Sequence, residues 1–259
     1  DRTVWVRGRL RSERRRRLGA IILTTTPGGT PSPGAATDAV AEACRTEGLD
    51  VLPWGEAAEL RARLALLNRE LGEPWPAMDD GALLDRAEQW LLPAVEALAA
   101  SGRRFDLRRL DVGAALRALL PWPQAARLDA LVPERLEIPS GSQVRVDYTA
   151  MVGGAAGAAG SAGSAVSADS GRAGRPVLAV RVQECFGWAA TPRIVEGRVA
   201  VLLHLLSPAR RPVAVTDDLA SFWEQGYPQV RAGIRGRYPK HAWPEDPWNA
   251  SATKGTGRR

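Results

Sequence analysis

The side chains best suited to contact a ligand lie near the C-terminal end of this sequence, where positive charges alternate with aromatic rings. The group consists of Arg235, Arg237, Tyr238, Lys240, His241 and Trp243. Cationic side chains contact phosphates and aromatic rings stack on bases, so this spacing favours binding of a single-stranded nucleic acid. The alternative is a packed tail, in which Tyr238 and Trp243 fasten the end of the chain to the domain before it.

A second concentration of positive charge lies near the N-terminal end. Arg14, Arg15, Arg16 and Arg17 are consecutive, and residues 1–17 hold eight arginines against two acidic residues. On a strand edge or a loop, four phosphate contacts from this cluster would give a slope of about −3 to −4 for log K against log salt. The alternative is a solvated arginine surface made denser by codon usage, because only two of the 35 basic residues are lysines.

The charge is distributed unevenly along the chain. The formal net charge is +6, but residues 228–259 carry seven basic against two acidic side chains, and residues 18–227 carry 20 against 25. The positive excess therefore lies at the two ends, on either side of an acidic middle. From these two ends we expect binding of single-stranded RNA that weakens steeply between low and physiological salt.

Motifs for catalysis, metal binding and nucleotide binding are missing from this sequence. A P-loop needs Gly-Lys-Ser/Thr, but Lys240 follows Pro239 and Lys254 follows Thr253. Neither a dinucleotide-binding glycine motif nor a Gly-x-Ser-x-Gly elbow is present. The two cysteines and two histidines lack the spacing of a zinc site, so a core or edge position is expected for His204. We therefore assign no catalytic or metal-binding residue, and an independent enzyme is the least favoured function.

Short apolar stretches predict strands on either side of the arginine cluster. They lie at Val4 to Val6 and at Leu18 to Leu23. Glycines and prolines then end this basic β segment, which we place at residues 1–33. A helical domain is expected over residues 34–133, because apolar residues recur there at helical spacing, and Thr37 or Asp38 would cap its first helix.

Two further helices can be outlined within this domain. A leucine stripe ends at Gly72 and consists of Leu60, Leu64, Leu67 and Leu71. Asp79 and Asp80 would open the next helix, which Pro93 would kink. Helix capping accounts for this acidic pair without a catalytic role.

After Pro133 the apolar period changes to that of strands. About five short strands fall within about 80 residues, with no room for crossover helices. This pattern predicts a small antiparallel β-barrel or half-barrel over residues 134–248, completed by a helix that Asp217 and Asp218 would cap. Residues 151–175 hold almost no large side chain and are expected to form a flexible insertion, and residues 249–259 a disordered basic tail. The predicted fold class is therefore α+β, with N-terminal strands, a central helical segment, the barrel, a helix and the tail.

Composition narrows the class of protein. With 259 residues, 45% of them hydrophobic and 25% charged, we expect a soluble globular protein of one to three packed units. Cys44 and Cys185 are too few for a disulfide framework, which indicates a reducing compartment. The longest apolar run is too short for a membrane span and no secretory signal is found, so we expect a cytoplasmic protein without a membrane partner. Several of the nine tryptophans adjoin prolines, as in Pro121-Trp122-Pro123, and are expected to act as structural wedges.

Particular residues, rather than composition, point to a family. The most specific stretch runs from Gly236 to Pro247 and contains Tyr-Pro-Lys-His-x-Trp-Pro-x-Asp-Pro. Another extends from Gly197 through Ser207-Pro208 and Thr216-Asp217-Asp218 to Phe222-Trp223. Shorter ones lie at Arg15–Ala20, Leu119–Pro123, Pro139–Ser142 and Leu178–Gly187. In order along nearly the whole chain, these stretches resemble the C-terminal region of the HrpB family of bacterial DExH-box ATP-dependent helicases.

The resemblance implies two RecA-like motor domains upstream that bind ATP and Mg²⁺, with this segment supplying accessory helical and OB-like modules around a nucleic-acid channel. Because no ATP motif is found here, we expect no cofactor in this chain, and ATP hydrolysis would belong to the upstream motors. No catalytic residue is carried over. The sequence departs from the family at residues 151–175, which look like an insertion, and at Pro228, where the final helix would bend or start again.

We therefore expect an accessory C-terminal portion of an ATP-dependent helicase, which grips a single strand, RNA rather than DNA, and supports its own upstream RecA-like domains. The alternative is a protein-interaction module that docks a partner or the parent's own motors without direct nucleic-acid contact. Unchanged RNA affinity together with lost stability in variants of Arg237, Lys240 and Trp243 would favour the packed-tail alternative.

Overall fold

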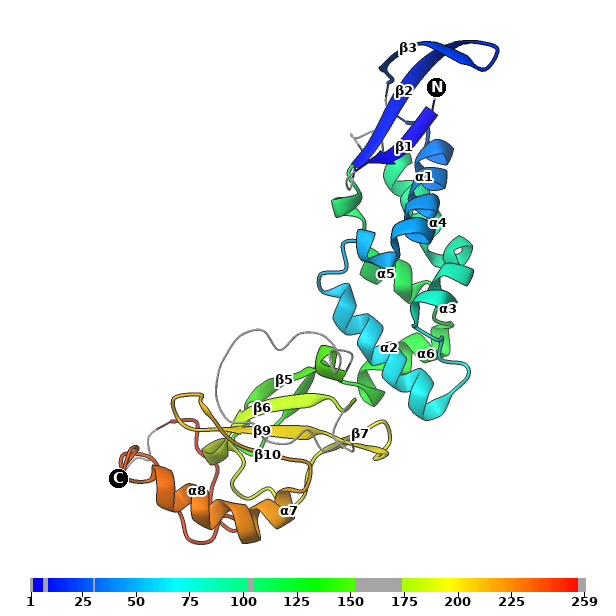
Figure 1. The fold of residues 1–259 in the computed structure, drawn as a ribbon. Helices are drawn as coiled ribbons and strands as arrows, with labels where there is room; N and C mark the ends of the chain where they lie inside the picture. The colour runs from blue at the N-terminus through cyan, green and yellow to red at the C-terminus, as the bar shows by residue number, and fades with distance from the viewer. Residues whose placement is uncertain (1, 7–8, 30, 102–104, 152–173, 256–259) are drawn as a thin grey trace. The chain divides into compact units, whose positions relative to one another are not determined.

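The computed structural model describes residues 2–6, 9–29, 31–101, 105–151 and 174–255 (Figure 1). It divides the chain into two compact units, Asp1–Ala126 and Arg127–Arg259. Each unit has its own secondary structure and core. Most of the expected flexible insertion, residues 151–175, lies outside the described residues. Within the described part of the chain, no helix is both long enough and apolar enough to cross a membrane.

An antiparallel three-stranded sheet opens the first unit, in the order β1-β2-β3. Its strands are β1 (Arg2–Val6), β2 (Arg9–Leu18) and β3 (Ile21–Pro27). A two-residue turn joins β2 to β3, and Gly19 has a φ of 59°, a conformation that glycine adopts readily at this position of a hairpin turn. Strands are thus confirmed in this segment. The stretch Leu18 to Leu23, expected as one strand, instead holds the turn, and the arginine cluster lies within β2.

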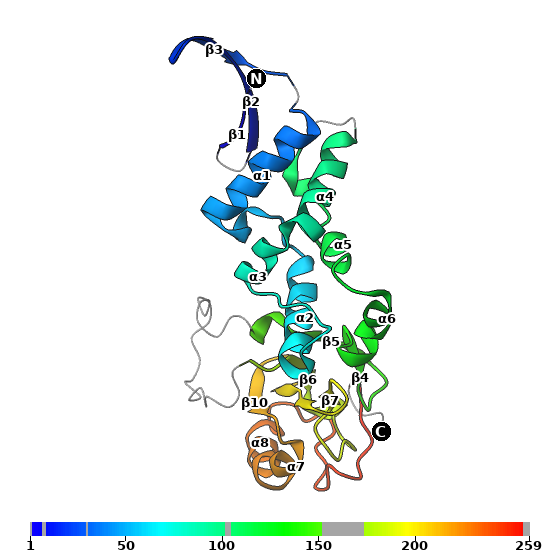
Figure 2. The same ribbon diagram turned by 90° about the vertical axis from the view of Figure 1, so that its right-hand side faces the viewer.

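Helices follow the sheet and supply most of the core of this unit. They are α1 (Pro33–Glu47), α2 (Ala57–Leu71), α3 (Asp80–Asp85), α4 (Ala87–Ala100) and α5 (Val112–Arg117), with single-turn 3₁₀ helices η1 (Leu49–Val51) and η2 (Leu107–Arg109). The boundary between the two units falls within the next helix, α6 (Trp122–Leu131). α1 packs against α4 and against β1 (Figures 1 and 2). The buried apolar side chains include Val40, Cys44, Leu64, Leu67, Trp90, Leu91 and Val95.

The start of α1 and the end of α2 differ in how well the local sequence predicts them. The predicted leucine stripe lies on α2, which ends before Gly72 as expected, and three of its leucines are buried: Leu60, Leu64 and Leu67. The N-cap of α1 is Ser32 rather than Thr37 or Asp38, and its hydroxyl accepts a first-turn N–H at 3.3 Å. Pro33 fits the first turn because a proline there loses no helical hydrogen bond.

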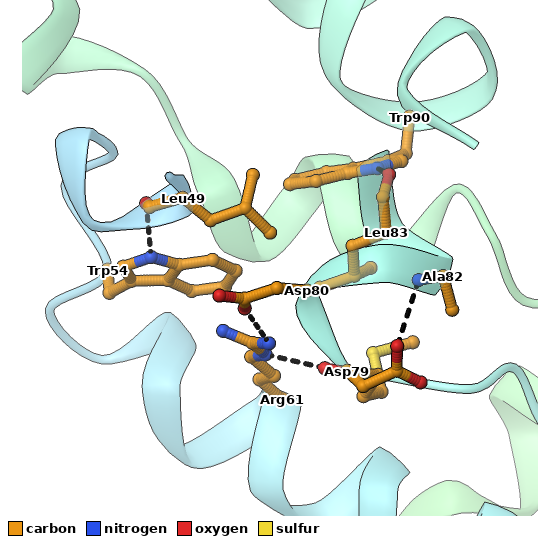
Figure 3. A network of polar contacts seen from close by, with 9 residues as sticks. Leu49, Trp54, Arg61, Asp79, Asp80, Ala82, Leu83 and Trp90 are labelled. Atoms are coloured by element: carbon orange, nitrogen blue, oxygen red, sulfur yellow. Dashed lines mark hydrogen bonds and ion pairs between the residues drawn. The ribbon is translucent and has the colours of Figure 1, made fainter. Parts of the chain in front are cut away.

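The acidic pair Asp79/Asp80 caps a helix and forms an ion pair (Figure 3). Asp79 is the N-cap of α3 and accepts the N–H of Ala82 at 3.0 Å, while Asp80 pairs with Arg61 at 2.6 Å. The Arg61 guanidinium also lies 4.7 Å from the ring centroid of Trp54, a cation–π distance. The capping prediction is confirmed at Asp79, and Trp54 is half-buried, with its indole N–H donating to the carbonyl of Leu49 at 2.8 Å.

The helix that Asp79 opens is shorter than expected. It ends at Asp85, and α4 begins at Ala87, so the helix is already interrupted at Arg86, before it reaches Pro93. α4 continues through Pro93, which stands in its second turn and lacks the N–H that would bond to the carbonyl of Gln89.

A five-stranded sheet forms the core of the second unit, in the order β10-β9-β6-β5-β4. Its strands are β4 (Arg135–Glu137), β5 (Gln143–Asp147), β6 (Val177–Arg181), β9 (Leu202–Leu206) and β10 (Pro212–Thr216). The strands β7 (Arg193–Ile194) and β8 (Val199–Ala200) pair with each other, and the 3₁₀ helices η3 (Thr149–Met151) and η4 (Val182–Glu184) follow β5 and β6. The central strands bury Val146, Leu178, Val180, Leu203 and Leu205.

The mixed α and β class is confirmed, but the expectation of a purely antiparallel barrel is wrong. β6 and β9 pair in parallel, with Leu178 opposite Leu203. The connection over residues 182–201 is long enough for the crossover that parallel pairing needs. The described strands have an open order with β10 and β4 at the two edges. Apolar alternation is the same in parallel and antiparallel strands, so the sequence pattern could not reveal this pairing.

The final helix consists of three segments, α7 (Leu219–Ser221), the π-helical turn η5 (Phe222–Gly226) and α8 (Tyr227–Ile234). Asp218 caps it as predicted and accepts the N–H of Ser221 at 3.1 Å. Pro228 enters in the first turn of α8, and the turn before it widens so that the N–H of Tyr227 bonds to the carbonyl of Phe222. The predicted restart at Pro228 therefore takes the form of a π turn.

Residues 249–255 belong to the described part of the chain, which differs from the disordered tail expected from residue 249. The N–H of Thr253 donates to the carbonyl of Gln183 at 2.9 Å, and the N–H of Gly187 donates to that of Pro247 at 2.9 Å. These bonds hold the segment to the second unit although it contains no helix or strand. Residues 256–259 lie outside the described residues.

Candidate nucleic-acid interface

The six cationic and aromatic residues near the C-terminus form one compact loop, the basic-aromatic loop (residues 235–243), directly after α8. The N–H of Tyr238 donates to the carbonyl of Ile234 at 3.1 Å, which turns the chain back on itself. The Tyr238 carbonyl then accepts both the N–H of His241 at 3.1 Å and the indole N–H of Trp243 at 2.9 Å. One carbonyl oxygen therefore holds the loop closed.

The charged and aromatic members of this loop differ in exposure. Arg235, Arg237 and Lys240 are exposed, whereas Tyr238, His241 and Trp243 are half-buried. The rings of Tyr238 and His241 meet edge to face, with centroids 6.2 Å apart and planes at 84°. The loop thus combines three solvated cations with aromatic rings whose positions are fixed, which suits phosphate contact beside base stacking.

Two residues that the sequence reasoning missed fasten this loop to α8. Arg231 donates from Nε to the Trp243 carbonyl at 2.9 Å and from Nη2 to Glu245 at 3.1 Å. The Tyr227 hydroxyl donates to the carbonyl of Pro244 at 2.9 Å, and burial raises the pKa of Tyr227 to about 12, with Arg231 opposing the shift. In the sequence, the one indication that Arg231 belongs with this loop was its position four residues, or one helical turn, before Arg235.

The arginine cluster lies on the β2–β3 hairpin. Arg14, Arg16 and Arg17 are exposed, whereas Arg15 is half-buried and pairs with Glu13 at 2.8 Å. Arg14 faces Thr26 and Arg16 faces Thr24 across the antiparallel pair, so these two arginines share one face of the hairpin. The hairpin and the basic-aromatic loop belong to different compact units.

Exposed apolar side chains gather at the tip of the same hairpin. Leu18, Ile21, Ile22 and Leu23 are 44–70% exposed. Trp122, at the start of α6, is 82% exposed, so the expected role of a structural wedge is wrong for this tryptophan. The flanking prolines indicated a conformationally restricted backbone at Trp122. They carried no information on whether its side chain is buried, because burial depends on residues far away in the sequence.

Burial shifts the pKa of three further side chains: His204, Cys44 and Cys185. His204 is half-buried in β9, where burial lowers its pKa while Asp147 opposes the shift. Burial raises the pKa of both cysteine thiols, Cys44 and Cys185. Over the described ranges, no three His, Cys, Asp or Glu side chains are grouped so as to hold a metal ion.

The cofactors that the resemblance assigns to upstream motors find no matching residues here. ATP binding would need the Gly-Lys-Ser/Thr arrangement, and both lysines of this chain stand in other contexts, after Pro239 and Thr253. Asp217 pairs with Arg175, and Asp218 caps α7, so this acidic pair has structural partners rather than an open position toward a metal. No step of ATP chemistry is therefore placed on this chain.

Comparison with known proteins confirms the family resemblance. Residues 90–247 match the HrpB C-terminal family, described as ATP-dependent helicase C-terminal. The ATP-dependent RNA helicase HrpB of Escherichia coli (strain K12) is 37% identical over 260 residues, which cover 99% of this chain and 29% of that protein.

Two solved structures are similar as well. The crystal structure of the E. coli DExH-box NTPase HrpB has a TM-score of 0.73 and 37% identity, covering 99% of this chain and 29% of that one. The crystal structure of the Escherichia coli DEAH/RHA helicase HrpB has a TM-score of 0.63 and 36% identity, covering 94% and 28%. The chain therefore spans less than a third of the length of these relatives. Because the family match covers more than half of its residues, the chain belongs to the HrpB C-terminal family of ATP-dependent helicases.

Proposed function

We propose that this chain is the accessory C-terminal region of an ATP-dependent RNA helicase and that it binds the single strand on which the parent enzyme acts. The relative from E. coli is named an RNA helicase, and this chain spans 29% of its length. The chain's own contribution is then binding and support, while ATP hydrolysis belongs to upstream RecA-like domains. The cytoplasm is the compartment in which such a protein would work.

The basic-aromatic loop is the observation that carries this proposal. It presents Arg235, Arg237 and Lys240 to solvent around Trp243, whose indole N–H donates to the Tyr238 carbonyl and whose own carbonyl accepts from Arg231. A strand crossing the loop would place phosphates against the cations and a base against an aromatic face. The exposed arginines of the hairpin, Arg14, Arg16 and Arg17, with the paired Arg15, supply a second cationic surface in the other unit.

Salt dependence tests the proposal on the full chain. The triple variant Arg235→Gln, Arg237→Gln, Lys240→Gln removes three charges and is expected to make the slope of log K against log salt less steep by about 2 for a single strand. A matched variant with Arg45→Gln, Arg108→Gln and Arg117→Gln removes the same charge from other exposed positions and is expected to keep the parent's slope. Fluorescence anisotropy with a short labelled RNA measures both.

Two outcomes of these measurements would contradict the proposal. If the parent chain shows no binding at low salt, the chain does not hold nucleic acid by itself. Equal slopes for the two triple variants would remove the basic-aromatic loop from the interface. DNA of the same sequence, measured in parallel, separates the expected RNA preference from binding of any polyanion.

A protein-interaction role is the second candidate, and the apolar hairpin tip favours it. Four side chains exposed by 44–70% at one tip form a surface that a partner protein could cover: Leu18, Ile21, Ile22 and Leu23. The double variant Leu18→Ser, Ile21→Ser is expected to weaken association with a separately produced HrpB-type motor region while leaving RNA affinity unchanged. Loss of RNA affinity in this variant, with motor association unchanged, would count against the second candidate.

A further inference from the structure

The C-terminal segment of residues 244–255, here called the strap, is held to the second unit by few bonds. The carbonyl of Pro244 accepts the Tyr227 hydroxyl at 2.9 Å, and that of Pro247 accepts the N–H of Gly187 at 2.9 Å. Near its end, the N–H of Thr253 donates to the carbonyl of Gln183 at 2.9 Å. No helix or strand is found within residues 244–255. A segment with so few backbone bonds opens at a lower free energy than the hydrogen-bonded strands of the same unit.

The strap lies directly against the chain at Gly187. This glycine has a φ of 79°, and a Cβ atom placed on it would lie 3.2 Å from the carbonyl oxygen of Ala250. The close approach of the strap therefore depends on the missing side chain at this position. It also places the strap over the turn that follows η4, the 3₁₀ helix that carries Gln183.

The residue whose carbonyl accepts the Thr253 N–H, Gln183, is 2% exposed, and neither its side-chain Oε1 nor its Nε2 has a hydrogen-bond partner among the described residues. The hydroxyl Oγ1 of Thr253, on the strap itself, is likewise buried without a partner in that part of the chain. Buried polar groups without partners are rare in folded proteins, and each one destabilises the state that buries it. Three buried polar atoms without a partner therefore lie on the two residues that the strap's last backbone hydrogen bond joins.

The strap continues directly from the basic-aromatic loop, and Arg231 touches both. Its Nε contacts the carbonyl of Trp243 in the loop, and its Nη2 contacts Glu245 in the strap. A strand bound at the loop therefore lies beside the residues that anchor the strap. The amide of Gln183, with a donor and an acceptor side by side, matches the paired acceptor and donor on the edge of an adenine base.

We propose that the strap is a displaceable cover over Gln183, and that opening presents the Gln183 amide to a base, adenine by preference, of the strand held at the basic-aromatic loop. This inference rests on the proposed function, because the base belongs to the RNA bound there. While the strap is closed, the Gln183 amide is covered and contacts no base. The affinity for RNA is then reduced by the fraction of chains in which the strap is closed.

Two substitutions at Thr253 shift the strap in opposite directions in the full chain. Thr253→Pro removes the N–H that bonds to Gln183 and is expected to open the strap. Thr253→Val keeps that N–H and removes the unpartnered hydroxyl, so it is expected to hold the strap more tightly. Hydrogen exchange of residues 248–255 should be faster in the first variant and slower in the second than in the parent, with exchange in β6 and β9 unchanged.

RNA binding then tests the buried amide. Thr253→Pro is expected to bind a short oligo(A) about fivefold more tightly than the parent, with a smaller gain for oligo(U), and Thr253→Val less tightly. Adding Gln183→Leu to Thr253→Pro should abolish the gain, whereas Gln183→Leu alone should have an effect of under about twofold because the strap covers it.

The possible failures are distinguishable. If the parent binds no RNA at low salt, the proposed function fails, and the base site fails with it. If the parent binds RNA but Thr253→Pro gains no affinity while its strap exchanges faster, the strap opens without uncovering a base site, and this inference alone is overturned. Exchange of residues 248–255 only through global unfolding, at the rate of β6 and β9, would show that the strap is a fixed part of the core.

Discussion

The indole N–H of Trp243 donates to the carbonyl oxygen of Tyr238 at 2.9 Å and closes the loop that carries Lys240 and His241. The same carbonyl accepts the N–H of His241, so two bonds converge on one oxygen. Trp243 therefore has a structural role whether or not a base stacks on it. The packed-tail and nucleic-acid alternatives are compatible, because the fastening that holds the rings leaves the neighbouring cations exposed.

Trp243→Phe separates these two roles. Phenylalanine keeps an aromatic face but lacks the N–H, so the variant should lose about 1 kcal/mol of stability through the lost hydrogen bond. RNA affinity should fall only slightly, because a stacking surface remains. Urea unfolding and anisotropy measure the two quantities. A loss of affinity as large as that of the triple charge variant would mean that loop closure, rather than charge, controls binding.

Gly226 is required by the π turn that precedes Pro228. A Cβ atom at this position would lie 2.7 Å from Cδ2 of Phe222, whose ring packs against Trp223 and Tyr227. Gly226→Ala should therefore destabilise the chain by about 1–3 kcal/mol through overpacking.

Gly233, in the same final helix, is the matched control for that substitution. Nothing lies within 4 Å of a Cβ atom placed there, so Gly233→Ala should stabilise by about 0.5–1 kcal/mol. Urea unfolding of both variants checks the opposite signs. Equal effects would show that the Phe222 ring moves aside.

Stability should fall as the pH is lowered through the range where histidine titrates. Burial lowers the pKa of His204 below its usual 6.5, while Asp147 opposes the shift. The unfolded chain keeps the usual pKa, so below about pH 6.5 it binds more protons at this site than the folded chain does, which favours unfolding. The contribution of neutral His204 to the free energy of unfolding is thus fully present above about pH 6.5. It is lost as the pH falls through the lowered pKa of His204 in the folded chain.

Two variants check this assignment by urea unfolding at pH 7.5 and pH 5.5. His204→Leu should remove the part of the pH dependence that belongs to this residue. Asp147→Asn should enlarge it, because the opposing charge is gone and the pKa of His204 falls further. If the pH dependence of stability is unaltered in both variants, a titratable group other than His204 is responsible for it.

Both thiols should be unreactive in the folded chain. Burial raises the pKa of Cys44 to about 11, with Arg45 opposing, and raises that of Cys185, with Glu184 adding to the shift. Because the thiolate is the reactive form, iodoacetamide at pH 8 should label neither residue until denaturant is added. Mass spectrometry of the labelled chain measures this, and rapid labelling of either cysteine without denaturant would contradict the burial.

Local sequence determined those parts of the fold that depend on near neighbours. The leucine stripe predicted α2 up to Gly72, and Asp79 and Asp218 were recognised as helix caps, because side-chain periodicity and capping act within a turn or two. The cations and rings of residues 235–243 were also identified as one group, since they are adjacent in the chain. Particular residue stretches, in order along the chain, further carried the resemblance to the helicase family.

Only the tertiary structure decided which distant segments meet. The parallel pairing of β6 with β9, the exposure of Trp122 and the hydrogen bond from the Thr253 N–H to the Gln183 carbonyl each depend on residues far away in the sequence. Period-two alternation is the same in parallel and antiparallel strands, and burial of one side chain is set by what packs over it. The sequence by itself therefore determined the capped and strongly periodic elements and the side chains available to them, whereas packing decided how distant strands pair, which groups are buried and which face solvent.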